Sequence, residues 1–530
     1  MAKDLSIPRA STPEEVEVDS QVVQAFLDKC MELHKELHSM MIIRHGKVAC
    51  EVYREPFNKD SVHMMYSFSK SVTSIATGFA IDEGYFSLDT KFLDIFPEFR
   101  NPKKPDAFLE ELCVEHLLTM RGGKGVSVLS NKSKDSWLKN FVNSDWYAEP
   151  GTQFMYINEC MYVLCCMIVK TTGMSVTRFL TKRLWEPLGI DVPYWETDPR
   201  GIEVGGWGLM LKTEDAAKFT LCMQQKGKYN GVQVIPEWWV EEASKKQADT
   251  AASTDKPDSQ VGYGYCFWRC AGYENAYRAD GMYSQYGIVF EDLDACLITT
   301  AGEINTQPMK TLIWEYFPKA FQSETFDPKN TVEISLPPYE RLPKSDRSPM
   351  EDKIECQRIR FSKPVILNIA GFPVSAVTMP ALYMEKDRAG NINNVSFKFY
   401  ENDGVILWTE GNEVNSVKFG LDGEYRWDYM KIGGVKYETC SIAQWKNDHI
   451  LELHIRALAT VSERVLTFTF DDKNRVQLKP SSNPPSSDML NQLTGNIKDV
   501  VANETLRKTL MKLMPKILEI VDSKHYGIVT

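Results

Sequence analysis

The composition of the chain changes between Ser323 and about Lys353, and this change decides how many folds the chain can contain. Proline, serine, lysine and aspartate accumulate there, which is typical of a linker. Helical and strand-like patterns alternate before this segment, whereas short apolar runs separated by turns such as Asp403-Gly404 and Gly433-Gly434 follow it. The chain has 530 residues, enough for two or more domains. We predict a mixed helix and strand domain, a linker, an all-β barrel or sandwich, and a helical tail, with ranges 1–322, 323–353, 354–485 and 486–530.

Hydrophobic periodicity locates the elements of the first domain. A helix is predicted over Val22–Leu37, followed by a β-hairpin over Met40–Tyr53 that turns at Arg44–Lys47. Further strands are predicted at Tyr263–Trp268, Gln285–Phe290 and Ala295–Thr300, and further helices at Leu109–Met120, at about Glu159–Thr172, up to Met223 and over residues 306–321.

The stretch Ser67-Phe68-Ser69-Lys70 is a candidate for a serine nucleophile with a lysine base. It opens a proline-free run of small and apolar residues, which predicts the start of a buried helix. Residues three apart share one helical face, so the Lys70 amine can lie beside the Ser67 hydroxyl. A serine needs an adjacent base to act as a nucleophile, and a desolvated lysine with a lowered pKa could be that base. The positive end of the helix dipole would favour the developing alkoxide.

The same tetrapeptide has a plain structural interpretation, in which the serine caps the helix and the lysine is solvated. The spacing also occurs at Ser136–Lys139 and Ser253–Lys256. The first of these is predicted on a short surface helix, and the second lies in a polar loop. Only the Ser67 copy opens a long run of small and apolar residues.

The histidine inventory bears on the choice of base. None of the eight histidines lies between His116 and His449, and no serine has a G-x-S-x-G context. A Ser-His-Asp triad built in the central region is therefore excluded, which favours lysine as the base of any serine enzyme.

A second candidate stretch runs from Pro150-Gly151 to Asn158, ahead of an apolar helix. Tyr156 and Asn158 would then lie at a helix entrance, where catalytic groups are often found. A tyrosine with a lowered pKa could share a proton with a lysine, and Asn158 could orient Lys70 or donate to a carbonyl. A core tyrosine and a capping asparagine would give the same pattern.

Charge and cysteine usage limit the partners and the compartment. The net charge of −11 argues against nucleic acid or an anionic membrane as a partner. The twelve cysteines are scattered, without C-x-x-C or zinc spacing, as in a reducing cytoplasm. Residues 1–15 lack an apolar signal region, and the longest apolar run, Met161–Val169, is too short to span a bilayer. We expect a cytoplasmic protein; its oligomeric state, including a homo-oligomer, stays open.

Taken in order, four stretches resemble the serine β-lactamase and penicillin-binding-like superfamily, in particular the class C-type branch with its esterases, 6-aminohexanoate-dimer hydrolases and D-amino-acid peptidases. They are Ser67–Lys70, Pro150–Asn158, Arg183–Gly189 and Gly205–Leu209. The resemblance covers about the first 320 residues and implies an α/β (α+β) fold, with an antiparallel sheet flanked by helices plus a helical subdomain. The all-β domain would follow it as a separate unit.

The resemblance assigns roles position by position. Ser67 would be the acylated nucleophile, Lys70 and Tyr156 the proton-transfer pair, and Asn158 an orienting group. The backbone N–H groups of Ser67 and Met282 would form the oxyanion hole. No metal or cofactor is implied.

The third motif departs from the β-lactamase pattern. Where β-lactamases carry Lys-Thr-Gly, this chain has Ala279-Asp280-Gly281-Met282-Tyr283-Ser284-Gln285, which is closer to the G-x-x-G-Q form of esterase and amidase relatives. Strand alternation is expected to turn the nearby Arg278 away, which leaves no cation for a β-lactam carboxylate. The predicted substrate-binding residues are Gly281, Tyr283, Ser284, Gln285 and Trp207, of which Trp207 equally fits a packing role.

The sequence thus predicts a serine hydrolase that cleaves a small ester or amide through an acyl-enzyme on Ser67. Acyl transfer, D-amino-acid peptidase or β-lactamase activity, and a catalytically silent binding or sensor protein are the alternatives that remain open.

Overall fold

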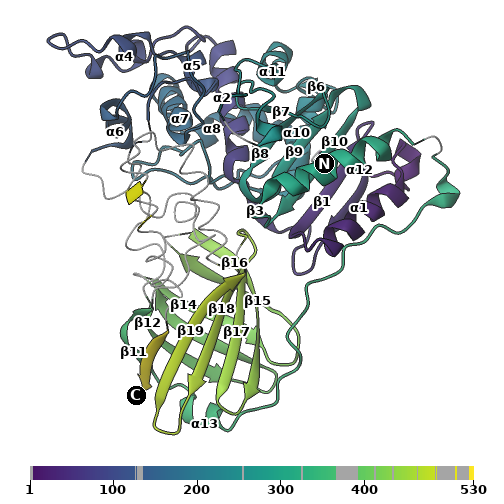
Figure 1. Cartoon of the computed structure of the whole chain (residues 1–530), viewed down its shortest axis with the longest axis vertical. Coiled ribbons are helices and arrows are strands. Elements are labelled where there is room, and N and C mark those ends of the chain that lie inside the picture. The colour runs from purple at the N-terminus through teal and green to yellow at the C-terminus, as the bar shows by residue number, and fades with distance from the viewer. Residues whose placement is uncertain are drawn as a thin grey trace. The chain divides into compact units, whose positions relative to one another are not determined.

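The chain divides into two units between Pro337 and Pro338, inside the segment whose composition predicts a linker (Figure 1). The computed structural model describes residues 4–125, 127, 135–253, 256–323, 326–365, 392–410, 413–432, 435–461, 463–483, 485, 508, 509, 512 and 524–530. The predicted turn at Gly433-Gly434 and most of the predicted helical tail lie outside these residues.

The first unit contains the predicted mixture of helices and strands. Its α-helices are α1 (Ser20–Glu32), α2 (Ser69–Asp82), α3 (Phe92–Ile95), α4 (Ala107–Glu111), α5 (Val114–Leu118), α6 (Trp137–Asn143), α7 (Asn158–Thr172), α8 (Val176–Leu180), α9 (Glu186–Leu188), α10 (Thr213–Gln224), α11 (Glu237–Ser244) and α12 (Thr306–Phe321). Its strands are β1 (Leu37–Arg44), β2 (Lys47–Tyr53), β3 (Val62–Met64), β4 (Met210–Lys212), β5 (Lys228–Tyr229), β6 (Val232–Gln233), β7 (Trp268–Arg269), β8 (Ala276–Gly281), β9 (Gln285–Phe290) and β10 (Ala295–Ala301).

An antiparallel sheet with the strand order β2-β1-β10-β9-β8-β7 organises this unit. Ile42 pairs with Leu297, which pairs in turn with Ile288, so the three side chains form one row on the same face. The opposite face carries α10, because a Cβ added to Gly287 of β9 would lie 2.4 Å from Thr220 Oγ1 of that helix. The sheet is therefore covered by helices on both faces, as the resemblance implies (Figure 1).

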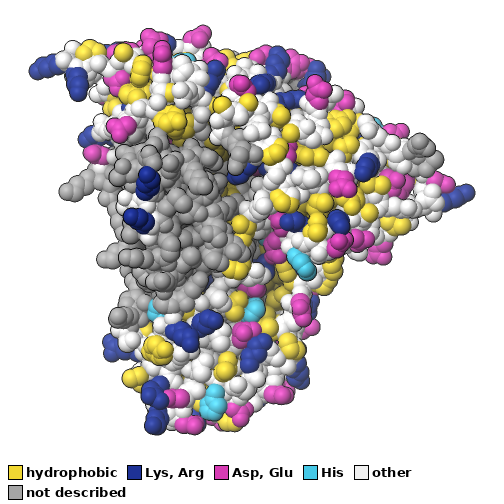
Figure 2. All heavy atoms as spheres, in the orientation of Figure 1, with side chains coloured by type: hydrophobic (Ala, Val, Ile, Leu, Met, Phe, Trp, Pro, Cys, Tyr) yellow, Lys and Arg dark blue, Asp and Glu magenta, His cyan; other side chains and the backbone are white. Residues whose placement is uncertain are grey.

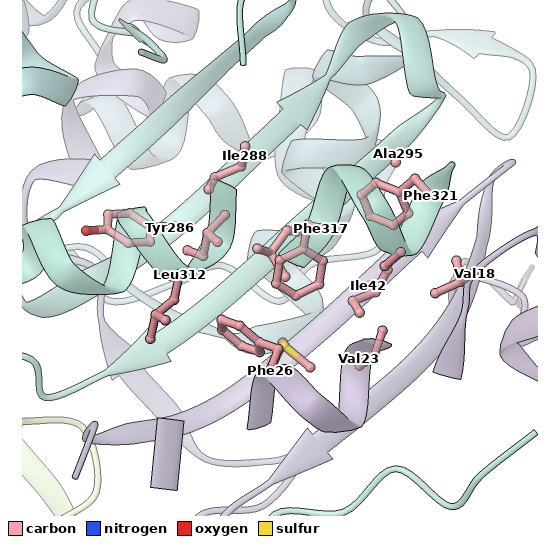
Figure 3. Packing of buried hydrophobic residues seen from close by; sticks show 14 of the residues in the cluster. Val18, Val23, Phe26, Ile42, Tyr286, Ile288, Ala295, Leu312, Phe317 and Phe321 are labelled. Carbon is pink, nitrogen blue, oxygen red and sulfur yellow. The ribbon is translucent and has the colours of Figure 1, made fainter. Parts of the chain in front are cut away.

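The row of apolar side chains on the sheet packs against α1 and α12. Phe26 of α1 and Phe317 of α12 meet edge to face, with ring centroids 4.9 Å apart, above Ile42 of β1 (Figure 3). Burying each such side chain is worth about 1.5–3 kcal/mol. This apolar layer fixes the sheet whose other end carries part of the candidate site.

Three predicted elements differ from the structure. The predicted strand Tyr263–Trp268 is wrong, because Cys266 adopts a positive φ of 66° there and only Trp268–Arg269 forms β7. The helix predicted over Val22–Leu37 ends at Glu32, and the one over Leu109–Met120 splits into α4 and α5. Strand β8 was assumed around Arg278, but hydrophobic periodicity did not identify it.

The second unit is all-β, as predicted. Its strands are β11 (Ile359–Val365), β12 (Ile392–Phe399), β13 (Asp403–Glu410), β14 (Glu413–Gly420), β15 (Arg426–Ile432), β16 (Val435–Asn447), β17 (Ile450–Ala457), β18 (Glu463–Phe470), β19 (Arg475–Asn483) and β20 (His525–Val529), with a short helix α13 (Met350–Ile354). They form one sheet in the order β14-β13-β12-β11-β20-β19-β18-β17-β16-β15, and Gly420 of β14 pairs with Ile442 of β16. This extra pairing closes the sheet into a barrel (Figure 1).

A buried ion pair crosses the inside of the barrel. Arg464 of β18 donates two hydrogen bonds, of 2.8 and 2.7 Å, to Glu410 of β13, and both side chains are at most 2% exposed. Because β13 and β18 are not neighbours in the sheet, the pair joins opposite walls.

The described surface mixes charges of both signs, and most of the cysteines are buried. Acidic and basic side chains are interspersed over the described surface that Figure 2 shows. All twelve cysteines are free, ten of them are buried, and Cys356 of the second unit is exposed. Of the helices that the structure describes, none by itself is long and apolar enough to cross a membrane; α7 and Val176–Leu188 meet the length and composition test only as a pair bent by 69°.

Candidate active site

Ser67 lies in a short 3-10 turn, Tyr66–Phe68, directly before α2 rather than inside it. Two hydrogen bonds with the Leu209 backbone hold this turn in place. The Met65 N–H donates to the Leu209 carbonyl at 2.8 Å, and the Leu209 N–H donates to Ser69 Oγ at 3.2 Å. Ser69 Oγ in turn donates to the Tyr66 carbonyl at 2.6 Å. Tyr66 has a positive φ of 48°, a conformation that a non-glycine residue keeps only where its surroundings hold it. The half-buried Ser67 therefore sits on a rigid elbow at the entrance of a buried helix.

Lys70 reaches Ser67 from one helical turn further on. Its Nζ donates hydrogen bonds to Ser67 Oγ at 2.8 Å, to Asn158 Oδ1 at 2.8 Å and to the Gly206 carbonyl at 2.7 Å. These three acceptors engage all three ammonium hydrogens and aim the amine at the serine. The structure thus brings together three of the predicted site groups from α2, α7 and the Gly205–Leu209 stretch.

The Lys70 amine is 1% exposed, and this burial lowers its pKa from the usual 10.5 to about 7. Cys266, Glu159, Asp280 and Cys160 act in the opposite direction, but burial dominates. A substantial fraction of Lys70 is therefore neutral near pH 7 and able to accept a proton.

Tyr156 and Asn158 lie where the Pro150-Gly151 turn leads into α7. The turn is constrained, because Gly151 has a φ of 85° and a Cβ there would lie 2.7 Å from His116 Nε2. Asn158 is the first residue of α7, and the Tyr156 ring lies under the Lys70 amine with 4.7 Å between Nζ and the ring centroid. The phenol is thus beside the Ser67–Lys70 pair.

The expectation that Tyr156 has a lowered pKa needs correction. Burial raises the pKa of its phenol, and hydrogen bonds with the Ser67 hydroxyl and the Trp268 indole counteract this only in part. Tyr156 is therefore a neutral phenol at pH 7, suited to donating or relaying a proton, and Lys70 is the better base.

Gly281 ends strand β8 directly against the turn that carries Ser67. A Cβ on Gly281 would lie 2.3 Å from the Met65 carbonyl oxygen, closer than any side chain tolerates. The next residues, Met282–Ser284, form a 3-10 turn in which Tyr283 and Ser284 have positive φ values of 64° and 68°. Met282 thus follows the point of closest approach, and its N–H and that of Ser67 stay the predicted oxyanion donors.

Four of the residues predicted to bind substrate have buried side chains. Trp207 is 1% exposed and donates from Nε1 to Glu196 Oε2 at 3.1 Å. The Gln285 amide donates to the Ala301 carbonyl at 2.6 Å, which links β9 to β10. Tyr283 and Ser284 are buried as well. Trp207, Ser284 and Gln285 have hydrogen-bond partners within the protein, and their role in substrate binding stays a prediction.

Sequence reasoning did not single out an aromatic wall next to Tyr156. The Trp268 ring lies 5.5 Å from that of Tyr156 and 5.7 Å from that of Phe154, and Tyr263 closes the group from behind. Phe154 and Trp268 are half-exposed. A pair of aromatic residues so far apart in sequence leaves no local pattern.

Arg278 makes its hydrogen bonds within the protein. It is fully buried and donates to Asp280 Oδ2 at 2.7 Å and to the carbonyls of Arg269 and Asp258 at 2.9 Å. Its guanidinium is thus committed to the protein. Among the described residues no group of three side chains is placed to hold a metal ion.

The other Ser-x-x-K copies differ in structure. Ser136 caps α6 by accepting the Lys139 N–H at 3.2 Å, and the half-exposed Lys139 amine bonds Asp135 at 2.7 Å. The copy at Ser253–Lys256 falls partly outside the described residues. The Ser-x-x-K spacing alone therefore does not define a candidate active site. The Ser67 copy differs because it lies at the start of a buried apolar helix.

A sheet covered by helices on both faces, with a serine and a buried lysine at the mouth of an inner helix, defines a β-lactamase-like hydrolase. The model of the Beta-lactamase family matches residues 24–301, more than half of the chain, and the protein belongs to this family.

Two curated relatives match parts of the chain. The 6-aminohexanoate-dimer hydrolase of Paenarthrobacter ureafaciens is 23% identical over 219 residues, 38% of this chain and 56% of the relative. A beta-lactamase of Escherichia coli (strain K12) is 24% identical over 157 residues, 29% of this chain and 40% of the relative. The chain thus spans about half the length of the curated relatives it matches.

Solved structures are similar at lower identity. A putative 6-aminohexanoate-dimer hydrolase from Bacillus anthracis has a TM-score of 0.49 at 18% identity, covering 59% of this chain and 87% of its own. A family VIII carboxylesterase has a TM-score of 0.47 at 15% identity, covering 59% of this chain and 98% of its own.

Proposed function

We propose that this protein hydrolyses a small ester or amide through an acyl-enzyme on Ser67. The observation that carries the proposal is the 2.8 Å contact between Lys70 Nζ and Ser67 Oγ, made by an amine whose pKa burial lowers to about 7. A buried amine near neutrality beside a hydroxyl is the arrangement that activates a serine without histidine.

The proposed reaction has two steps, acylation of Ser67 and hydrolysis of the acyl-enzyme. Neutral Lys70 takes the proton of Ser67 Oγ while the oxygen attacks the substrate carbonyl. The backbone N–H groups of Ser67 and Met282 stabilise the oxyanion, and loss of one such donor typically costs about 10²–10³ in turnover. Tyr156 relays the proton to the leaving alcohol or amine. Water then attacks the acyl-enzyme, gives up a proton to the same pair and releases the acid.

The third motif favours ordinary esters and amides over β-lactams. Asp280 precedes Gly281 where β-lactamases place a threonine, and the nearby Arg278 guanidinium is occupied by hydrogen bonds within the protein. A substrate carboxylate would meet the partly exposed Asp280 rather than a free cation. We therefore propose slow or no turnover of nitrocefin relative to p-nitrophenyl esters.

Covalent labelling tests the proposal. A fluorophosphonate probe should label the intact protein, and Ser67→Ala should abolish labelling. Ser136→Ala is the matched control, because it removes the serine of a second Ser-x-x-K copy that caps a surface helix, and labelling should persist. Labelling of the Ser67→Ala variant would show that the nucleophile is misassigned. Product analysis with alcohol or amine acceptors would show whether water or an acceptor takes the acyl group.

A further inference from the structure

The aromatic wall beside Tyr156 is a part of the candidate site that the proposed reaction does not use. It consists of Phe154, Tyr263 and Trp268, which come from two segments far apart in the sequence. The centres of these three rings lie 6.5, 6.0 and 5.5 Å from the centre of the Tyr156 ring. Aromatic rings at such separations attract one another, so the wall and Tyr156 form one packed group.

A series of contacts connects the wall to the nucleophile. Lys70 Nζ lies 2.8 Å from Ser67 Oγ and 4.7 Å from the centre of the Tyr156 ring. The Trp268 ring is next, 5.5 Å beyond Tyr156. In the proposed reaction Tyr156 relays the proton to the leaving alcohol or amine. The leaving group is therefore the part of the substrate that reaches the wall.

Two rings of the wall are accessible to a ligand, and the third supports them. Phe154 and Trp268 are partly exposed. Tyr263 is 1% exposed, and its ring centre lies 5.3 Å from that of Phe154 and 4.7 Å from that of Trp268. Ligand sites are usually lined by aromatic and apolar side chains with a few polar groups, which Ser67 and Tyr156 supply here.

The Trp268 ring is held in a defined position. Its backbone pairs with Arg278 in the ladder between β7 and β8, and the Arg278 guanidinium lies over the ring, 5.9 Å from its centre. Arg278 is itself fixed by its hydrogen bonds to Asp280 and to two backbone carbonyls. A ring that is fixed before binding loses little conformational freedom when a ligand stacks on it.

The charges in this region favour a neutral ligand. The Arg278 guanidinium is a permanent positive charge next to the Trp268 ring. A second cation on the same ring would be repelled by it. A carboxylate would meet the negative faces of the aromatic rings. The wall therefore suits a group that is flat, apolar and uncharged.

We propose that Trp268 is a specificity-determining residue and that the wall binds a neutral aromatic leaving group, such as the benzyl part of a benzyl ester or benzylamide. The inference deepens the proposed function and rests on it, because it names the leaving group of the same reaction. Stacking on Trp268 and Phe154 should favour a flat ring over a saturated ring of similar size by about two- to tenfold in kcat/KM.

The first experiment compares three acetate esters in the full-length protein: benzyl acetate, cyclohexylmethyl acetate and acetylcholine, whose leaving group is a cation. Each kcat/KM is divided by the rate of alkaline hydrolysis of the same ester, which removes differences in intrinsic reactivity. Benzyl acetate should be the best substrate and acetylcholine the poorest. In Trp268→Leu, which stays apolar but loses the ring, the preference for benzyl over cyclohexylmethyl should fall by about two- to tenfold. Trp268→Phe should keep most of the preference.

The second experiment measures binding without turnover. 4-Fluorobenzyl alcohol is titrated into the wild-type protein and followed by fluorine NMR. Its Kd should rise by about two- to tenfold in Trp268→Leu.

Trp238 supplies the matched control. It is a tryptophan with 38% of its surface exposed, and its ring lies 5.4 Å from that of Trp239 on the same helix, α11. Its indole donates to Asp82, outside the candidate site. Trp238→Leu should leave both the ester preference and the Kd unchanged.

The two readouts separate the possible failures. If Trp268→Leu lowers kcat/KM equally for the benzyl and cyclohexylmethyl esters, the wall only supports Tyr156 and the inference is overturned. A preference for acetylcholine, or no binding of the fluorinated alcohol, overturns it as well. If the alcohol binds and Trp268→Leu weakens this binding, but no ester is hydrolysed, the aromatic site stands and the proposed function fails. Should Trp268→Leu not fold, Phe154→Leu takes its place with the same expected changes, and no change in either readout would overturn the inference.

Discussion

Lys70 is subject to two opposing influences. Its three hydrogen bonds to neutral acceptors favour the ammonium, whereas its burial favours the amine, and burial dominates. The sequence predicted this residue and Ser67 because the contact between them is local, one helical turn apart. The wall formed by Trp268 was not predicted, because it depends on segments that the fold brings together.

The lowered pKa of Lys70 predicts the pH dependence of the reaction. Below about pH 7 the amine is protonated and cannot act as a base, so kcat/KM should fall about tenfold per pH unit there and level off above it. Lys70→Arg keeps a permanent charge and should reduce kcat/KM by about 10²–10⁴ at every pH. Lys139→Arg in the surface copy of the motif should have no effect. A midpoint near pH 10 would contradict the desolvated lysine.

At the scale of elements, the approach of β8 to the turn before α2 builds the site. Strands β9 and β10 and helix α12 were predictable because their apolar residues repeat at the period of a strand or a helix. Periodicity did not identify strand β8, because Ala276–Gly281 carries Arg278 and Asp280, which pair with each other at 2.7 Å inside the protein. A sequence pattern shows their polarity but not their pairing.

The close approach at Gly281 makes this element contact sensitive to one methyl group. In Gly281→Ala the new Cβ would lie 2.3 Å from the Met65 carbonyl oxygen, so β8 or the turn that carries Ser67 must shift. We expect the free energy of unfolding to fall by about 1–3 kcal/mol. We also expect kcat to fall, in the fraction of protein that stays folded, because the predicted oxyanion donors move apart. Urea denaturation and ester hydrolysis would measure both.

Gly125 provides the control for this substitution. Its φ is not positive, and an added Cβ would make only an ordinary contact, 3.6 Å from the Asp145 carbonyl oxygen. Gly125→Ala should leave activity and stability nearly unchanged. Equal tolerance at Gly281 would mean that the two elements are not held as closely as described.

At the scale of the whole molecule, the two units have separate cores. The sequence predicted both from the change in composition and from the strand patterns after it, although β15, β19, β20 and nearly all of β11 were not predicted. The Arg464–Glu410 pair inside the barrel could not be predicted, because the two residues are 54 positions apart on strands that are not neighbours.

Removing one partner of this pair should destabilise the barrel alone. Arg464→Met leaves Glu410 buried without its cation, which typically costs about 3–5 kcal/mol. Calorimetry should show one unfolding transition moved to lower temperature and the other unchanged. Arg426→Met breaks partly exposed ion pairs with Asp403 and Asp422 and should have a much smaller effect. A single transition that shifts as a whole would contradict separate unfolding.

The distribution of thiols has a practical consequence. Because Cys356 is the exposed cysteine and ten others are buried, a maleimide dye added to the native protein should attach mainly in the barrel unit, far in sequence from Ser67. A fluorophosphonate carrying a second fluorophore attaches at Ser67. The natural chain therefore accepts a donor and an acceptor dye at two defined positions without any engineered cysteine, and energy transfer between them would report directly on the separation of its two halves in solution.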